Sequence, residues 1–290
     1  MRRAPLALAA VALAAAALPA GAQSWRTITA QREIAHEDAL HVTVVYGLGK
    51  LTVRAAEPAV LYDLNARFDA EAFRVHRGYD AAARSLFVGA DSAAGDQLSV
   101  RLFPGGQRHR TSDGYLTLGV ARGIPVDLTV KLGIGAANLE LGDLWLSRLA
   151  LSTRFGGAEV DFRTPNPQPM KEVLIDSHFG GVDVKELGNT HAELVRIAVT
   201  FGGADVDLRG AWTGEMQVAV NARFAGVSLM VPRDVGVMVD ASTKLGGASV
   251  KGFVRKGSAL YSPNYDSAPR KLHITGSTTF GAMDVEWVEP

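Results

Sequence analysis

Strand-like alternation interrupted by a pair of glycines is the feature that most constrains how this chain can fold. In residues 196–208 (RIAVTFGGADVDL), every second residue from Ile197 to Phe201 is apolar, and after Gly202 and Gly203 the apolar residues take the other parity. Successive side chains of a strand point to opposite faces, so one face stays inward only if the chain turns a corner at the glycines. Glycine supplies the backbone freedom for that corner. The pattern predicts a bent strand in which Phe201 faces inward with Ile197.

The same unit recurs along the chain. It first occurs at residues 40–53 (LHVTVVYGLGKLTV), and from residue 126 onward it is nearly periodic, with intervals of 21 to 24 residues and a last interval of 35. The residues that we align before the corners are Leu132, Phe155, Phe179, Phe201, Phe224, Leu245 and Phe280. Constant spacing is typical of a solenoid, in which copies stack about 4.8 Å apart. A run of antiparallel hairpins with the same period is the alternative, and the near-constant spacing favours the solenoid.

The predicted fold is all-β. We expect a parallel, β-helix-like solenoid of about seven Gly-cornered repeats over residues 126–290, preceded by a mainly antiparallel β-sheet region over residues 23–125. Within that first region, residues 54–125 break the period. The proline-containing segments 164–170 and 255–271 are expected to form loops. The glycines assigned to structural corners are Gly156, Gly157, Gly180, Gly181, Gly202, Gly203, Gly226, Gly246, Gly247 and Gly281.

The N-terminus has the pattern of a secretory signal peptide over residues 1–22. Arg2 and Arg3 precede an apolar run at residues 5–18, and small residues follow at 20–22. An uncleaved membrane anchor is the alternative, but the run is short for a bilayer span. We therefore expect an exported chain that begins at Gln23, in the periplasm or outside the cell, with no membrane span after cleavage.

Charge and cysteine content exclude several classes of function. The chain has 30 basic and 30 acidic residues, and loss of the predicted signal leaves 28 and 30. No basic cluster interleaved with aromatic residues occurs, so nucleic-acid binding is not expected. With no cysteine, the chain can form neither a disulfide nor a Cys-ligated metal site.

Acidic residues recur at one repeat position after the corner. They are Glu159, Asp183, Asp205 and Asp284. In a solenoid they would form an outer ladder, and carboxylates are natural ligands of Ca²⁺. However, Ser228 and Ser249 interrupt the series, and the Gly–Asp nonapeptide of calcium-binding solenoids is absent. A solvated polar ladder is the favoured interpretation, and we predict no metal and no cofactor.

No catalytic constellation is found. The sequence has no HExxH or GxSxG motif. A mixed column precedes the corners, with Arg154, Arg223 and Lys244 in three copies. Such a column could bind an anionic glycan in a β-helix enzyme, but a surface stripe of long cationic side chains is commoner.

The repeated FGGA-[DE]-V unit, preceded by VVYGLGKLTVRA, resembles the bacterial toast-rack and LiaF-like families, with a looser likeness to adhesin-type β-solenoids. The resemblance covers about residues 40–290, and residues 123–162 are especially similar. LiaF-like proteins are membrane regulators of envelope-stress responses that act through protein contacts. The resemblance therefore implies a non-catalytic role, although this chain differs in having a signal peptide and no membrane helix.

Together these observations predict an exported, non-catalytic binding module of the cell envelope, linked by the resemblance to envelope stress. Its expected partner is an envelope protein or a glycan. Two alternatives remain open, a β-helix enzyme that acts on polysaccharide and an adhesin-like structural rod. The enzyme would need acidic and basic groups that converge on one cleft.

Overall fold

The computed structural model describes residues 24–92 and 114–289, and the predicted signal peptide at 1–22 lies outside them. Nearly all regular structure is β. The strands are β1 (Trp25–Glu33), β2 (Leu40–Ala55), β3 (Val60–Asp69), β4 (Phe73–Asp80), β5 (Ser85–Ser92), β6 (Tyr115–Val120), β7 (Pro125–Glu140), β8 (Trp145–Asp161), β9 (Glu172–Lys185), β10 (Leu194–Asp207), β11 (Glu215–Pro232), β12 (Gly236–Val250), β13 (Val254–Lys256), β14 (Ala259–Tyr261) and β15 (Lys271–Val288). A 3₁₀ turn, η2 (Leu187–Thr190), lies between β9 and β10.

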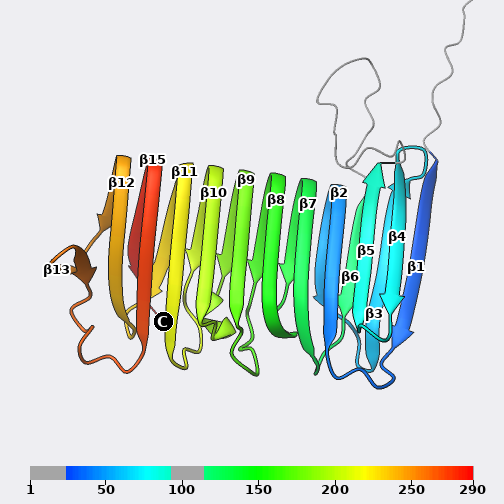
Figure 1. The fold of residues 1–290 in the computed structure, drawn as a ribbon, viewed down its shortest axis with the longest axis horizontal. Helices are drawn as coiled ribbons and strands as arrows, with labels where there is room; N and C mark the ends of the chain where they lie inside the picture. Colours follow the sequence, from blue (N-terminus) through cyan, green and yellow to red (C-terminus); the bar gives the residue numbers. More distant parts are fainter. Residues whose placement is uncertain (1–23, 93–113, 290) are drawn as a thin grey trace, which may run out of the picture.

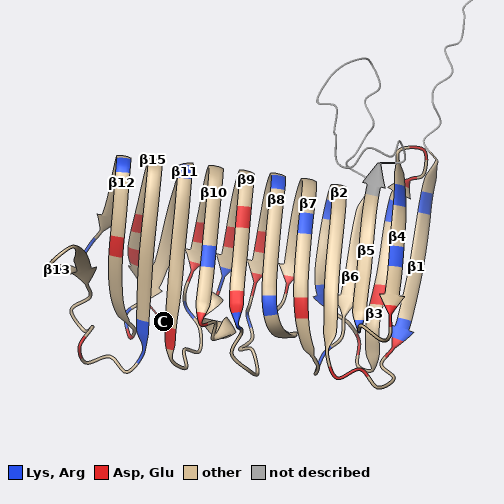
Figure 2. Ribbon diagram, in the orientation of Figure 1, with Lys and Arg blue, Asp and Glu red and all other residues tan. Residues whose placement is uncertain are grey.

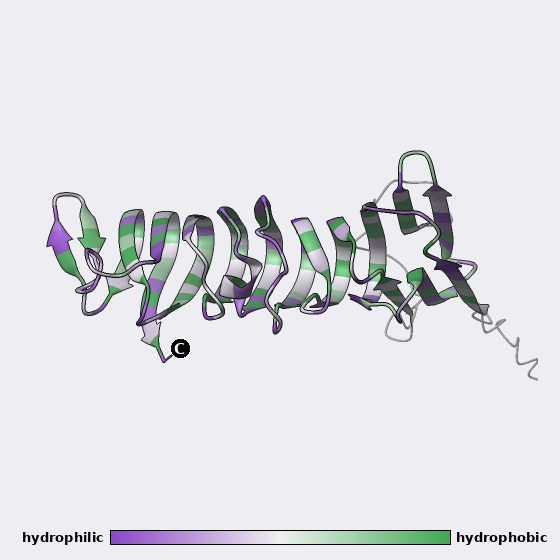
Figure 3. Ribbon diagram, turned by 90° about the horizontal axis from the view of Figure 1, so that it is seen from below, coloured by the Kyte–Doolittle hydropathy of each residue, from purple (hydrophilic) through white to green (hydrophobic). Residues whose placement is uncertain are grey.

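Eight long strands form a parallel stack in the order β2, β7, β8, β9, β10, β11, β15 and β12. Each strand bends at its glycine corner into a first arm and a second arm. In Figure 1 the first arms form the front layer, the corners lie along the upper edge, and the second arms descend behind. Seen from below, the bent strands follow one another along a single axis (Figure 3). The predicted all-β, solenoid-like fold is confirmed.

The hydrophobic core lies between the two arms. In β10 the first arm buries Val195, Ile197 and Val199, and the second arm buries Ala204 and Val206. The inward parity therefore changes at the corner, as the alternation predicts. The same pattern in the other long strands, except for β12, whose second arm buries no residue, gives one continuous core along the stack.

The prediction that Phe201 faces inward is wrong. Its side chain is 39% exposed, although Val199 is almost fully buried. The backbone kinks between the two residues: Val199 pairs with Ala222 and Phe201 with Phe224, but the intervening Thr200 has no partner in the register. The kink turns the side chain before the glycine to the outside of the corner.

The alignment of Leu132 with the phenylalanines was also wrong. The register places Ile134 beside Phe155, whereas Leu132 lies beside Thr153 and is buried. The first corner of the periodic region therefore comes two residues later than the repeat pattern indicated.

The last two repeats stack in an order that differs from their order in the sequence. Strand β15 inserts between β11 and β12, so that Phe280 lies between Phe224 and Leu245. The preceding segment carries β13 and β14, and β14 pairs with β12 on the side away from β15. The 35-residue interval thus lets the chain return past β12 and enter the stack beside β11.

At the N-terminal end, two short strands take the place of one bent strand. Strand β5 pairs in parallel with the first arm of β2, and β6 pairs in parallel with its second arm. Antiparallel strands then cover both arms, β4 on β5 and β3 on β6, and β1 closes the outer side of β3. These N-terminal antiparallel strands thus cap one end of the parallel stack.

Buried asparagines join the loops that return the chain to the next first arm. Asn189 Nδ2 donates to the carbonyl of Phe162, and its Oδ1 accepts from the backbone N–H of Ala211. Asn166 donates to the carbonyl of Leu146 and accepts from the same residue's N–H. These bonds satisfy backbone groups that the irregular loops would otherwise bury without partners.

Candidate functional site

The acidic ladder of Glu159, Asp183, Asp205 and Asp284 lies on the outer face of the second arms. The register places Glu159, Asp183 and Asp205 side by side on β8, β9 and β10. Ser228 on β11 then separates Asp205 from Asp284. The structure therefore brings three of the four acids together and leaves the fourth apart.

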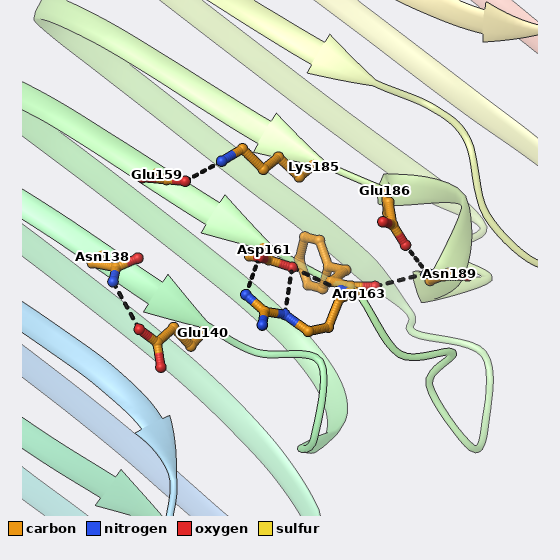
Figure 4. Close-up of polar contacts among 9 residues, drawn as sticks. Asn138, Glu140, Glu159, Asp161, Arg163, Lys185, Glu186 and Asn189 are labelled. Atoms are coloured by element: carbon orange, nitrogen blue, oxygen red, sulfur yellow. Dashed lines mark hydrogen bonds and ion pairs between the residues drawn. The ribbon is translucent and has the colours of Figure 1, made fainter. Parts of the chain in front are cut away.

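The three adjacent carboxylates repel one another. Partial burial raises the pKa of Asp183, and the charges of Glu159 and Asp205 raise it further, against the opposing effect of Lys185. The Lys185 ammonium hydrogen-bonds the Glu159 carboxylate, and this bond raises the pKa of Lys185 (Figure 4). The Lys185 cation thus lies beside the three adjacent carboxylates of the ladder.

Two acids farther along the second arms have arginine partners of their own. Asp161 forms an ion pair of 2.5 Å with Arg163, which lowers the pKa of that carboxyl (Figure 4). On β10, Asp207 forms the equivalent ion pair of 2.7 Å with Arg209. These carboxylates are held in local i, i+2 pairs, so they do not converge with the ladder on a common point.

A shallow, open groove is lined in part by Glu159, Asp183 and Asp205 of the acidic ladder. Its volume is about 510 Å³, and its floor is formed largely by small residues such as Gly157, Gly181 and Gly203. Among the described residues, no group of three or more His, Asp or Glu side chains is arranged to hold a metal ion. The groove is open to solvent along its length and is not an enclosed active-site pocket.

The corner glycines pack the stacked strands closely. Gly156, Gly180, Gly202 and Gly246 have φ values between 128° and 145°. Gly281 lies in the same column, opposite Ala225. The second residues of the corners form a neighbouring column that contains Gly157, Gly181, Gly203, Gly226 and Gly247, with Ala282 of β15 between the last two.

Next to the glycines, an apolar stripe follows the corner through all eight long strands; it is partly buried on β2, β7 and β8 and exposed on the other five. We call it the corner ridge; in spatial order it consists of Leu48, Ile134, Phe155, Phe179, Phe201, Phe224, Phe280 and Leu245. The five phenylalanine rings stack with centroids 4.8 to 5.0 Å apart. Phe179, Phe224 and Phe280 are 42%, 48% and 44% exposed, and Leu245 is 58% exposed.

The corner ridge was not predicted from the sequence, because the alternation of residues places its members in the core. A signal was present in the chain. Core positions of the repeat vary among Val, Ile, Leu, Met and Ala, whereas the position before the corner is phenylalanine in five copies. Repetition of one aromatic residue is typical of a stack of like side chains on a sheet surface.

The cationic residues that precede the ridge do not form one cluster. Two strands separate Arg154 on β8 from Arg223 on β11, and β15 separates Arg223 from Lys244 on β12. Among the other members of this column, His178 lies 3.8 Å from the Asp176 carboxylate. The column is therefore dispersed along the corner edge, and it does not bring cations together with the acidic ladder.

Comparison with known proteins gives one family match and several distant structural similarities. Residues 178–285 match the model for the C-terminal region of LiaF, the cell wall-active antibiotics response family. No curated protein shows significant sequence similarity to the chain. None of the described residues lies in a helix that is long and apolar enough to cross a membrane.

The solved structures share little sequence with the chain. A candidate cell adhesion protein from Clostridium sporogenes is 12% identical, with a TM-score of 0.48 over 91% of this chain and 100% of that chain. A candidate adhesin from Bacteroides fragilis is 10% identical, with a TM-score of 0.36 over 90% and 97% of the two chains. The resemblance of this chain to the LiaF-like family is confirmed over residues 178–285, which extend from β9 to β15 in the stack.

Proposed function

We propose that this chain is an exported, non-catalytic interaction module of the cell envelope that binds its partner along the corner ridge. The observation that carries the proposal is the stack of five partly exposed phenylalanine rings on one edge of the fold. A contiguous exposed apolar stripe is costly in water and is typical of an interaction surface. The family match over residues 178–285 supports a role in the envelope, in the periplasm or outside the cell.

The arrangement of charged groups supports binding rather than catalysis. The acids that flank the ladder form local pairs with cations, as Asp161 does with Arg163. A general acid–base pair needs two groups of matched pKa that reach one substrate atom. The ladder instead offers a row of like groups along an open strip.

Site-specific photo-crosslinking in living cells tests this proposal. A benzophenone amino acid replaces Phe201 on the ridge or, as a matched control, Gln217 on the exposed outer face of a first arm. Irradiation should attach an envelope protein, glycan or lipid to the ridge position and little to the control. Equal labelling at both positions, or none at the ridge, would show that the ridge is not the interaction surface.

A further inference from the structure

We propose that the corner ridge docks on an anionic phospholipid surface. This inference rests on the proposed function and names the chemical class of its partner. It combines the shape of the ridge, its apolar side chains and the sign of the charges beside them.

The ridge is a straight, convex edge. Its residues are in register from β2 to β12, and the phenylalanine rings are parallel to within 10°. Eight strands at a spacing of about 4.8 Å give it a length of roughly 34 Å. It lies along the upper edge in Figure 1, where the two layers meet. A convex line of this kind can enter a flat interface along its whole length, whereas a peptide or a sugar chain binds most closely in a concave groove.

The charged residues nearest the ridge along each strand are cations, whereas the acids lie farther away: Asp176 is three residues before the ridge, and the acidic ladder is four residues after it. In each long strand, the segment from one residue before the ridge to two residues after it reads, in spatial order, GLGK, GIGA, RFGG, HFGG, TFGG, RFAG, TFGA and KLGG. These segments contain the four cations Lys50, Arg154, Arg223 and Lys244, all of them exposed, and no Asp or Glu. Figure 2 shows the same separation, with Lys and Arg at the tips of β8 and β12 and the acidic residues farther down the strands.

A nearly neutral chain therefore presents a cationic, aromatic edge. Aromatic side chains favour the membrane interface, and each Lys or Arg close to an anionic leaflet contributes about 1 kcal/mol of attraction. The same charges oppose pairing with a second copy of the chain, because two ridges in contact would bring cations of like sign together. Charge complementarity therefore favours an anionic headgroup layer as the occupant.

Vesicle cosedimentation tests the inference. The protein is purified as its own cells produce it and mixed with vesicles of phosphatidylcholine, alone or with phosphatidylglycerol. Binding should need phosphatidylglycerol and weaken as salt is added. The triple variant Arg154→Gln, Arg223→Gln, Lys244→Gln should bind roughly 100-fold more weakly, which is the combined effect of three interfacial cations. Every variant keeps the same N-terminus, so the difference reports on the ridge.

Two further variants separate the ridge from general effects. Arg74→Gln, Arg77→Gln, Arg196→Gln removes three exposed cations that lie away from the ridge, and it should bind like the parent. Phe201→Ser, Phe224→Ser should lose binding while keeping a parent-like circular dichroism spectrum. If this aromatic variant unfolds, the test rests on the triple variant of Arg154, Arg223 and Lys244, because that variant leaves the phenylalanine stack intact.

Several results would overturn the inference. They are equal binding to both vesicle types, equal loss in the two cation variants, or ridge-dependent dimers in place of vesicle binding. If the ridge position crosslinks in cells but the protein binds neither vesicle type, the proposed interaction module is supported and the lipid inference is wrong. If the ridge position does not crosslink, the proposed function fails first.

Discussion

A Cβ atom at Gly202 would lie 1.9 Å from the carbonyl oxygen of Gly180 in the neighbouring strand. Gly202 also has a φ of 129°, a region that is nearly exclusive to glycine. Gly202→Ala should therefore destabilise the fold by at least about 3 kcal/mol, through backbone strain and overpacking together. The measurement is the free energy of unfolding in urea.

The neighbouring glycine column supplies the control for this substitution. A Cβ at Gly181 would meet no atom within 4 Å, and its φ is not in the positive region. Gly181→Ala should change the free energy of unfolding by less than about 1 kcal/mol. Similar losses in Gly202→Ala and Gly181→Ala would contradict the assignment of close packing to the first glycine of the corner.

Adjacent residues in the second arm of β10 should differ strongly in their sensitivity to a change of polarity. Val206 is fully buried, so Val206→Asp should cost about 3 to 5 kcal/mol by placing an unpaired carboxylate in the core. Asp205 is exposed and lies beside Asp183, so Asp205→Val should leave the stability within about 0.5 kcal/mol of the parent. Thermal unfolding of the two variants compares them directly, and equal effects would mean that the inward face of this arm is misassigned.

The alternation of residues and the positions of glycine were sufficient to predict the stacked, bent strands. The switch of inward parity between Val199 and Ala204 can be read directly from the sequence, because strand geometry has a period of two. The kink at Thr200 cannot be read this way, since it depends on how neighbouring strands pair around the corner. That kink turns Phe201 outward and creates the ridge.

Strand order was beyond the reach of the repeat pattern for a different reason. An interval of 35 residues shows that a copy is interrupted, but not on which side of β12 the next strand enters. The answer depends on pairing partners that are distant in sequence, such as Phe224 with Phe280. For the acidic ladder, the sequence predicted that the acids share one repeat position. It did not predict the bond between Lys185 and Glu159, because Lys185 lies two residues after Asp183 on β9 and comes close to Glu159 only through the pairing of β8 with β9.

The buried side chain of Asn189 should be essential for the return loops. Asn189→Asp replaces the Nδ2 donor with a carboxylate oxygen that faces the Phe162 carbonyl and the Glu186 carboxylate. We expect a loss of about 3 kcal/mol or more in the free energy of unfolding, because the oxygen that replaces Nδ2 would then face two acceptors without a donor, even though the Ala211 N–H still bonds the other oxygen. Asn138→Asp is the control, since Asn138 makes a single side-chain bond to Glu140 at the surface; a comparable loss there would argue against a special role for Asn189.

Acid should weaken the contact between the β1–β2 connection and the N-terminal cap through Glu37. Its carboxylate accepts hydrogen bonds from the Ala35 N–H at 2.7 Å and the Tyr79 hydroxyl at 2.8 Å. Burial raises its pKa, but these bonds outweigh burial and lower the pKa from 4.5 to about 2. A lowered folded-state pKa stabilises the fold above the unfolded value, and that contribution is lost as the pH falls from 4.5 towards 2.

The variant Glu37→Gln isolates this contribution. Its melting temperature should lie below that of the parent at pH 7, and the difference should shrink between pH 4.5 and 2, where the parent carboxylate becomes neutral. A difference that is constant across this range would show that the carboxylate charge does not stabilise the cap.

The opposite sign applies to the acidic ladder, where Asp183 lies between Glu159 and Asp205. Because burial and the neighbouring carboxylates raise its pKa above 3.8, ionisation of Asp183 disfavours the folded state. This penalty is present above the folded-state pKa and disappears as the pH falls below 3.8. Asp183→Asn should therefore raise the melting temperature at pH 7 and have no such effect at pH 3.

Addition of Ca²⁺ at pH 7 separates a solvated ladder from a metal site, because a calcium site would raise the melting temperature of the parent strongly and that of Asp183→Asn much less. A ladder that is only a polar surface gives the same small response to Ca²⁺ in both proteins, and in the control Asp284→Asn, whose carboxylate is separated from the other three by Ser228.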